Sequence, residues 1–240
     1  MVVWLFAGGG ESEVKGYVLF LRKHFSGCEF SRKTPSRYKP GTRLNNKPST
    51  YGLNKKSFTN EIKKQFKSAI NDPKDKCDLI LVIDDLDCRD ATKLEREFID
   101  TIDSVQGSEE IERFVGFAAP ELESWIIADW DNSIGRHPDF RSRGDSMKHW
   151  LINEKDIDFS QPESFSKYNI ENDSCEDKLS EAIKEATIKE ASKQQVNNNI
   201  YSKGRHTPDL IMEIDPNIVK NKCPLFNKLY NFLNSHCSNN

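Results

Sequence analysis

Acidic residues follow three apolar segments of this chain, and their spacing suits the binding of a metal ion. The segments read MVVWLFAGGGESEV from residue 1, CDLILVIDDLD from residue 77 and RFVGFAAPELESW from residue 113. The acids are Glu11 and Glu13, then Asp84, Asp85 and Asp87, then Glu121 and Glu123. Clustered carboxylates repel one another unless a cation neutralises them, and oxygen ligands without histidine or cysteine favour Mg²⁺ or Mn²⁺. The residue types therefore predict a site for one of these two ions.

The D-x-D spacing of Asp85 and Asp87 is the strongest part of this pattern. Side chains two residues apart lie on the same side of an extended strand, so both carboxylates can reach one metal ion. The alternative is that Asp84 and Asp85 cap the turn and helix that follow, as many aspartates in turns do. Because acids follow three separate strands, the metal site is favoured over the capping role. The expected ligands are Glu11, Asp84, Asp85 and Asp87.

Strands and helices alternate along the first half of the chain. The expected strands are residues 1–7, 28–31, 77–87 and 113–120, and the expected helices begin near residues 12, 58, 91 and 121. Apolar runs without a polar face indicate strands that are buried on both sides, and parallel strands need crossover helices between them. The sequence thus predicts an α/β fold with a four-stranded parallel sheet flanked by helices. In such sheets ligands bind at the carboxyl ends of the strands, so the acids are expected to converge.

The pattern changes beyond residue 130. A charged helix is expected over residues 175–195, and two amphipathic helices are expected from about Pro208 and Pro224. Residues 136–144 and 161–174 show no such period and are expected to be loops. We therefore expect an α/β domain over residues 1–130 and a C-terminal helical extension over residues 131–240.

Composition limits the class of protein. The chain has 240 residues with a formal net charge of −3, which excludes a uniformly basic DNA-coating protein. No apolar run is long enough to cross a bilayer, and the first run lacks the basic leader of a signal peptide, so a cytoplasmic protein without membrane contact is expected. The six cysteines and five histidines are dispersed without zinc-like spacing, which predicts separate reduced thiols and no zinc site.

Positive charge is concentrated between Ser31 and Ile70. This stretch holds eleven lysines and arginines against one acid, Glu61. Such a patch attracts polyphosphate, and the interleaved Tyr38 and Tyr51 suit stacking on unpaired bases. A solvated loop without a ligand is the alternative. The expected nucleic-acid contacts are Arg32, Lys33, Arg37, Lys39, Arg43, Lys47, Lys55 and Lys56.

The ordered motifs resemble the TOPRIM (topoisomerase–primase) superfamily. The resemblance covers residues 1–130 through the Gly-rich turn with ESE, then VIDDLD, then PELESWIIAD, with a weaker match at YSKGRH. It is closest to small TOPRIM-like proteins encoded beside AAA/ABC-type ATPases in bacterial defence loci, which are related to overcoming-lysogenization-defect nucleases. It implies Mg²⁺ or Mn²⁺ as cofactor. The catalytic residues that it implies are Glu11, Glu13, Asp85, Asp87, Glu123 and Lys203. Gly9 stands where the family's first motif carries its leading Glu, so Glu11 or Glu13 must replace it or the site is degenerate.

Three functions follow as hypotheses. The first is a Mg²⁺-dependent nuclease, acting on DNA or on RNA including tRNA, as the effector of an ATPase partner in antiviral defence, with a monomer and a homodimer as open alternatives. The second is a catalytically weakened TOPRIM module that binds nucleic acid or regulates a partner. The third, a phosphotransferase or primase-like enzyme, lacks a recognisable nucleotide motif.

Overall fold

The computed structural model describes residues 1–35, 55–72, 75–194 and 199–237, with the backbone alone at residues 11–12, 55–57 and 191–194. The chain forms two compact units. The first comprises Met1–Asp84, Ala91–Gly116 and Leu233–Asn240, and the second comprises Asp85–Asp90 and Phe117–Phe232. Both contain buried apolar side chains of their own, such as Phe6 in the first and Trp125 in the second.

A four-stranded parallel sheet forms the first unit, with the strand order β2-β1-β3-β4. The strands are β1 (Val2–Ala7), β2 (Glu29–Thr34), β3 (Leu79–Asp85) and β4 (Glu112–Ala118). On β1, Val3 pairs with Phe30 of β2 and with Leu79 of β3, both in parallel. The apolar residues of β1 and β3 are buried almost throughout, which explains why these strands show no alternation in the sequence. The expected α/β fold with a four-stranded parallel sheet is confirmed.

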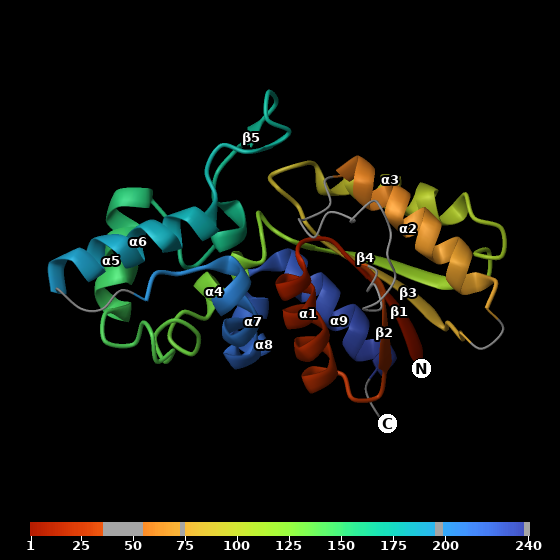
Figure 1. Ribbon diagram of the computed structural model, residues 1–240, viewed down its shortest axis with the longest axis horizontal. Helices are drawn as coiled ribbons and strands as arrows, with labels where there is room; N and C mark the ends of the chain where they lie inside the picture. Colours follow the sequence, from red (N-terminus) through yellow and green to blue (C-terminus); the bar gives the residue numbers. More distant parts are fainter. Residues whose placement is uncertain (36–54, 73–74, 195–198, 238–240) are drawn as a thin grey trace, which may run out of the picture. The chain divides into compact units, whose positions relative to one another are not determined.

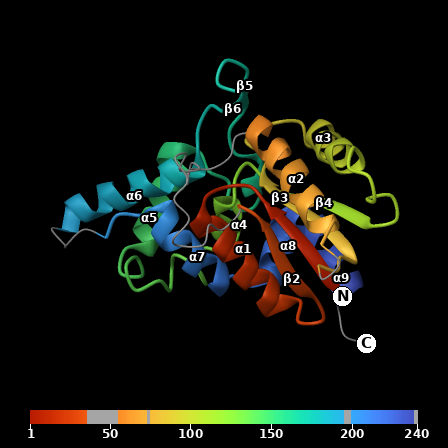
Figure 2. The ribbon, with the colours of Figure 1, turned by 45° about the vertical axis from the view of Figure 1, so that its right-hand side comes forward.

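Helices connect the strands of this sheet. They are α1 (Glu11–His24), α2 (Lys55–Ile70) and α3 (Ala91–Asp103). The connection from β1 to β2 and the connection from β2 to β3 run in opposite directions across the sheet, so right-handed crossovers place α1 and α2 on opposite faces (Figures 1 and 2). Trp4 and Phe6 of β1 contact Phe66 of α2, with ring centroids 5.8 and 6.2 Å apart.

Helices dominate the second unit. They are α4 (Glu123–Ala128), α5 (Gly144–Lys155), α6 (Leu179–Gln194), α7 (Lys203–Glu213), α8 (Pro216–Lys222) and the part of α9 (Pro224–Cys237) up to Phe232, with the short 3₁₀ helix η1 (Pro162–Ser164) and a hairpin of β5 (Tyr168–Asn169) and β6 (Ser174–Cys175). Every residue of α4 is buried, and Trp125 packs on Phe226 of α9 with ring centroids 4.7 Å apart. The expected C-terminal helices are confirmed. In the part of the chain that the structure describes, no helix has the length and apolar character of a membrane span.

Three helices of this unit differ from the sequence-based expectation. Helix α8 begins at Pro216, so the stretch expected to form one helix from Pro208 is divided between α7 and α8. The helix expected from Pro208 begins at Lys203, and Pro208 lies inside it. Proline is favoured in the first turn of a helix, which made Pro208 a natural start, but the residues before it are helical as well. Helix α5 begins at Gly144, where no helix was expected, because its apolar period is weak and only Gly144, Met147 and Leu151 are buried.

Two disulfides correct the expectation of six reduced thiols. Cys28 is bonded to Cys237 and Cys88 to Cys175, and both Cα–Cα distances are 5.1 Å. The partners are 209 and 87 residues apart, so local spacing carried no signal of either bond. Cys77 and Cys223 are free thiols.

Candidate functional site

The site lies in the second unit, where the chain after β3 runs beside the chain after β4. Leu86 donates its backbone N–H to the carbonyl of Ala118, and Asp87 donates to the carbonyl of Pro120, both at 2.8 Å. The side chain of Asp85 accepts a further hydrogen bond from the backbone N–H of Leu122 at 3.0 Å. These three bonds fix Asp85 next to the start of α4.

Three carboxylates surround the ammonium group of Lys203, the first residue of α7. The Nζ atom lies 3.3 Å from Oδ2 of Asp85, 3.1 Å from Oε2 of Glu121 and 3.2 Å from Oε2 of Glu123. We call these four residues the Lys203 cluster. Helices α4 and α7 lie side by side (Figure 1), which brings Glu123 and Lys203 together from positions 80 residues apart in the chain.

Hydrogen bonds fix the two glutamates of the Lys203 cluster. Glu121 accepts from the backbone N–H of Ser180 at 2.6 Å and from its hydroxyl at 3.1 Å. Glu123 is fully buried and accepts from the hydroxyls of Tyr201 at 2.6 Å and Thr207 at 2.9 Å. Burial raises the pKa of Tyr201 well above its usual value, and the charge of Glu123 raises it further, so the phenol remains a proton donor.

The charges of the Lys203 cluster do not balance. Three carboxylates face one ammonium, and the side chains of Glu121 and Glu123 are only 6% and 0% exposed. Buried charges are costly unless they are paired, so removing the single cation would leave the carboxylates strongly destabilising. The cluster therefore requires a cation at its centre, and Lys203 supplies it.

The carboxylates of the Lys203 cluster are not spaced as the ligands of a metal ion. Within the described ranges 1–35, 55–72, 75–194 and 199–237, no three acidic, histidine or cysteine side chains are arranged as ligands of one metal ion. In the Lys203 cluster the oxygens are spaced around Nζ at 3.1 to 3.3 Å, whereas Mg²⁺–oxygen bonds are about 2.1 Å long. The arrangement is thus that of carboxylates around an ammonium ion.

Asp87 is held beside the Lys203 cluster on a turn with left-handed backbone conformation, with φ of 49° at Asp87 and 60° at Cys88. Its carboxylate pairs with Arg89 at 3.1 Å, and Arg89 also contacts Asp173 at the β5–β6 hairpin. Burial raises the pKa of Asp87, and Arg89 opposes the shift. The disulfide from Cys88 to Cys175 fixes the same turn to the same hairpin.

The acids of the Gly-rich turn belong to the first unit. Glu13 accepts a hydrogen bond from the backbone N–H of Gly10 at 2.7 Å and so completes the N-terminal cap of α1. Gly9 has a φ of +89°, and a Cβ there would lie 2.8 Å from the Glu13 carboxylate, which explains a glycine at this position. The side chain of Glu11 lies outside the described residues.

Asp84, also in the first unit, lies against the Gly-rich turn. Gly8 donates its N–H to the carbonyl of Ile83 at 2.8 Å, and a Cβ on Gly8 would lie 1.8 Å from Oδ1 of Asp84. A glycine is needed at residue 8 because the carboxylate of Asp84 occupies the space that a side chain would take. The close contact of the first motif with the third strand therefore involves Asp84, while Asp85 joins the Lys203 cluster.

Two of the eight expected nucleic-acid contacts lie in β2. Arg32 donates to the carbonyls of Thr34 and Pro35, and Lys33 pairs with Asp75. The side chains of Lys55 and Lys56, at the start of α2, lie outside the described residues. The same is true of Arg37, Lys39, Arg43 and Lys47.

Sequence reasoning missed the hydroxyl groups of the site. Tyr201, Thr207 and Ser180 orient the glutamates, yet none was singled out, and Glu121 was noted only as a strand-end acid. A usable signal was present for two of them. Tyr201 and Thr207 flank Lys203 in YSKGRHT, and Thr207 lies four residues after Lys203, on the same face of a helix.

Glu163 of η1 is a partly buried carboxylate of this unit. It accepts hydrogen bonds from the backbone N–H groups of Leu225 at 2.9 Å and Phe226 at 3.1 Å, at the start of α9. Burial raises its pKa to about 7, and the two hydrogen bonds oppose the shift. Both of these donors are backbone groups, in contrast to the ammonium of the Lys203 cluster.

Comparison with known proteins gives a family without an activity. Neither the curated proteins nor the solved structures contain a match to the chain. A sequence model of a domain of unknown function, DUF4276, matches residues 20–234. This range includes most of the first unit, all of the second and every residue of the Lys203 cluster, and the chain therefore belongs to the DUF4276 family.

Proposed function

We propose that the chain is a Mg²⁺- or Mn²⁺-dependent nuclease whose active site is the Lys203 cluster. One observation carries this proposal: three carboxylates from the segments that follow β3 and β4 converge on one positive charge. In parallel sheets, the residues that follow the strands are the usual place for ligands. The TOPRIM resemblance supports this proposal, because Asp85, Glu123 and Lys203 are among the catalytic residues that it implies.

The chemical type of the donors, rather than their spacing around Lys203, favours a hard divalent cation. Asp85, Glu121 and Glu123 offer carboxylate oxygens alone, which is the preference of Mg²⁺ and Mn²⁺, and their excess negative charge favours a dication over a single ammonium. These three residues would hold the ion, with Asp87 as a fourth candidate. When bound, the ion polarises the phosphoryl oxygens and makes its bound water a stronger acid.

The chain's own residues would have distinct tasks. The side chain of Lys203 is partly exposed. Lys203 would pair with a phosphate oxygen of the substrate when a divalent cation neutralises the carboxylates of the cluster in its place. Tyr201 and Thr207 keep the Glu123 carboxylate in one orientation and leave its other oxygen, Oε2, to face the Lys203 ammonium. Ser180 does the same for Glu121.

The partners and the location are part of the proposal. We infer a nucleic-acid substrate from the basic residues 31–70, and an AAA/ABC-type ATPase partner and cytoplasmic antiviral defence from the resemblance. The two disulfides oppose a cytoplasmic location, because such bonds are rare in reducing compartments. Acid quenching of cells followed by alkylation of the denatured chain tests this point: blocking of all six cysteines supports the cytoplasm, and blocking of only Cys77 and Cys223 contradicts it.

Cleavage assays with matched variants test the activity. The full chain is incubated with single- and double-stranded DNA, RNA and tRNA, with Mg²⁺, Mn²⁺ or EDTA, and with and without a candidate ATPase. Asp85→Asn keeps an acceptor for Leu122 but removes the charge, and we expect it to lower metal-dependent cleavage by about 100-fold or more. Asp145→Asn, at an exposed position of α5, is the control and should cleave like the wild type. Absence of cleavage under every condition contradicts the nuclease.

A catalytically weakened module is the second candidate, and the position of Lys203 favours it. An ammonium at the centre of the carboxylates already supplies the cation that they need. This candidate predicts binding of nucleic acid without turnover, and a binding affinity that Asp85→Asn does not change.

A further inference from the structure

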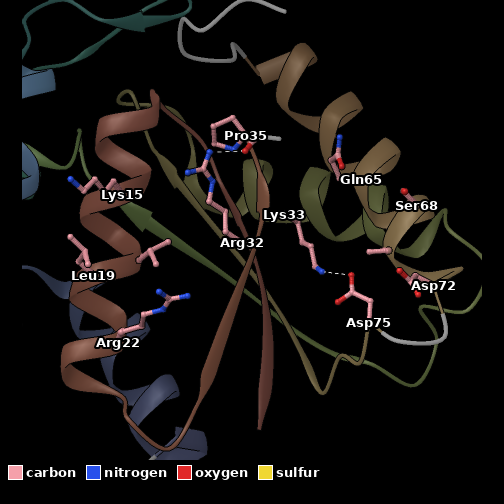
Figure 3. A pocket seen from close by; sticks show the side chains of 12 residues that line it. Lys15, Leu19, Arg22, Arg32, Lys33, Pro35, Gln65, Ser68, Asp72 and Asp75 are labelled. Carbon is pink, nitrogen blue, oxygen red and sulfur yellow. Dashed lines mark hydrogen bonds and ion pairs between the residues drawn. The ribbon is translucent and has the colours of Figure 1, made fainter. Parts of the chain in front are cut away.

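We propose that a cavity of the first unit binds a phosphate monoester of nucleotide size. The cavity has a volume of ≈ 610 Å³ and opens between α1, β2 and the end of α2 (Figure 3). Sites for small organic ligands have volumes of about 300–1,000 Å³. None of the residues of the Lys203 cluster lines it, so the proposal stands apart from the proposed nuclease activity.

Positive charge is in excess on the wall of this cavity. Its ionisable lining residues are Lys15, Arg22, Arg32, Lys33, Asp72 and Asp75. Lys33 pairs with Asp75, and its ammonium also lies over the ring of Trp4 at 4.5 Å. The charges of Lys33 and Asp75 therefore compensate each other within the wall of the cavity. The other ionisable lining residues in the described part of the chain are the cations Lys15, Arg22 and Arg32 and the acid Asp72. A phosphate monoester, with a charge of about −1.5 to −2 at neutral pH, matches this excess better than a diester with a single charge.

Two arginines of the cavity are held in place by the edge strand β2. Arg22 donates to the carbonyl of Phe30 at 3.2 Å, and Arg32 donates to the carbonyls of Thr34 at 3.2 Å and Pro35 at 2.7 Å. A guanidinium has five N–H groups, so Arg22 keeps further donors for a ligand. Fixing a guanidinium before binding lowers the entropic cost of recognising a phosphate.

The same contacts argue against a peptide strand as the ligand. An edge strand recruits another strand through unpaired backbone groups. Here the side chains of Arg22 and Arg32 already engage carbonyls of residues 30, 34 and 35. The cavity is therefore better suited to an anion than to β-strand addition.

The rest of the cavity suits the remainder of a nucleotide. Val18, Leu19 and Ala69 offer apolar surface, while Gln65 and Asp72 offer groups that accept or donate hydrogen bonds, and they line it from α1 on one side and from α2 and its end on the other (Figure 3). A nucleoside has both an apolar ring face and hydroxyl or amino donors. The ligand could be a free nucleotide or the phosphorylated end of a nucleic-acid strand, and only the second source rests on the proposed function.

Binding measurements on the full chain separate these cases. Calorimetric titration with AMP, GMP, CMP and UMP is compared with titration by the corresponding nucleosides, and oligonucleotides are compared with and without a 5′-phosphate. We expect the phosphate to strengthen binding by about tenfold or more. Binding only by the 5′-phosphorylated oligonucleotide identifies the strand end as the source, whereas binding by mononucleotides identifies the free ligand.

Charge-reversal variants test the position of the site. Arg22→Glu and Lys15→Glu change exposed residues of α1 and should weaken binding of the phosphorylated probe by about tenfold or more. Lys64→Glu, next to Gln65 on the exposed side of α2 and outside the cavity lining, is the control and should bind like the wild type. Circular dichroism confirms that each variant folds. The proposal is overturned if no phosphorylated probe binds at millimolar concentration, if nucleosides bind equally well, or if the control loses as much affinity as Arg22→Glu.

Discussion

The Lys203 cluster and the surroundings of Glu163 stabilise carboxylates that are largely removed from solvent in two different ways. In the Lys203 cluster an ammonium lies within 3.3 Å of three carboxylates. Glu163 has two backbone N–H groups, and its pKa is raised to about 7. Backbone dipoles compensate part of the desolvation of a carboxylate, while a full positive charge can hold several carboxylates together. The first arrangement suits a site that gathers charge, and the second suits a group that takes up a proton near neutral pH.

Removal of the central cation should have the largest effect on stability. Lys203→Met keeps the length of the side chain but removes the ammonium that pairs with Asp85, Glu121 and Glu123. We expect the free energy of unfolding to fall by about 3–5 kcal/mol at neutral pH. Lys184→Met, which breaks an exposed pair with Glu181 on α6, is the control and should cost about 0–1 kcal/mol. Urea denaturation measures both, and equal losses would contradict the central role of Lys203.

The second-largest change in the free energy of unfolding should come from the titration of Glu163. The folded chain holds this proton to about pH 7, whereas the usual value is 4.5, so its stabilising contribution is complete below pH 4.5 and is lost as the pH rises through 7. Relative to Glu163→Gln, the wild type should lose roughly 3 kcal/mol of unfolding free energy across this range. Urea denaturation at a series of pH values measures the loss. Glu171→Gln, at an exposed position, should follow the wild type, and a flat difference between wild type and Glu163→Gln would show that Glu163 titrates normally.

Divalent cations should restore part of the stability that the Lys203→Met variant loses. If the carboxylates accept Mg²⁺ or Mn²⁺, the ion replaces the missing ammonium and should stabilise the variant by about 2.7 kcal/mol at a hundredfold excess over its dissociation constant. Thermal unfolding with and without the ion, at constant ionic strength, measures the effect. A smaller gain is expected for the wild type, where Lys203 competes for the same oxygens. Equal stabilisation of both proteins would place the ion elsewhere.

Loss of one hydroxyl of the site should have a moderate effect. Tyr201→Phe removes the 2.6 Å hydrogen bond to Glu123 but leaves the bond from Thr207. Because the acceptor is charged and buried, we expect a loss of about 1.5–3 kcal/mol. Urea denaturation of Tyr201→Phe against Tyr168→Phe, whose hydroxyl bonds Asp173 at an exposed position, isolates the effect of burial. If Tyr201→Phe lowers the free energy of unfolding by less than Tyr168→Phe does, then the Tyr201 hydroxyl does not stabilise the Glu123 carboxylate.

The smallest change in stability should accompany Asp87→Asn. Burial already disfavours the charge of Asp87, as its raised pKa indicates, and the loss of the pair with Arg89 offsets the gain from removing that charge. The unfolding free energy should therefore stay within about 1 kcal/mol of the wild type. A loss of metal-dependent cleavage at unchanged stability would assign Asp87 a role in activity. A large loss of stability would make it a structural residue of the turn.

Much of the first unit follows from local sequence patterns. Buried parallel strands leave unbroken apolar runs, and helices leave a period of 3.6, so β1, β3 and α3 could be predicted nearly residue by residue. The edge strand β2 was harder, because its polar residues Ser31, Arg32 and Lys33 follow no apolar run, and it extends to Thr34, three residues beyond the expected end.

The Lys203 cluster could be predicted only in part. Asp85 and Glu123 follow strands, where acids stand out against apolar neighbours. The partners of Glu121 and Glu123 lie in the last third of the chain, on Ser180, Tyr201 and Thr207, and contacts across such separations leave no periodicity to detect. The split roles of Asp84 and Asp85 were likewise invisible, because adjacent carboxylates look alike in a sequence and differ only by the side of the strand on which they lie.

The bond between Cys28 and Cys237 makes most of this polypeptide a covalent ring. The partners are 209 residues apart, and the bond between Cys88 and Cys175 closes a smaller ring inside the first. In the chain-entropy model a ring of this size restricts the unfolded ensemble by about 5 kcal/mol. It also means that a protease that cuts one peptide bond inside the ring does not release a fragment, so nicked and intact molecules migrate apart on a gel only after reduction.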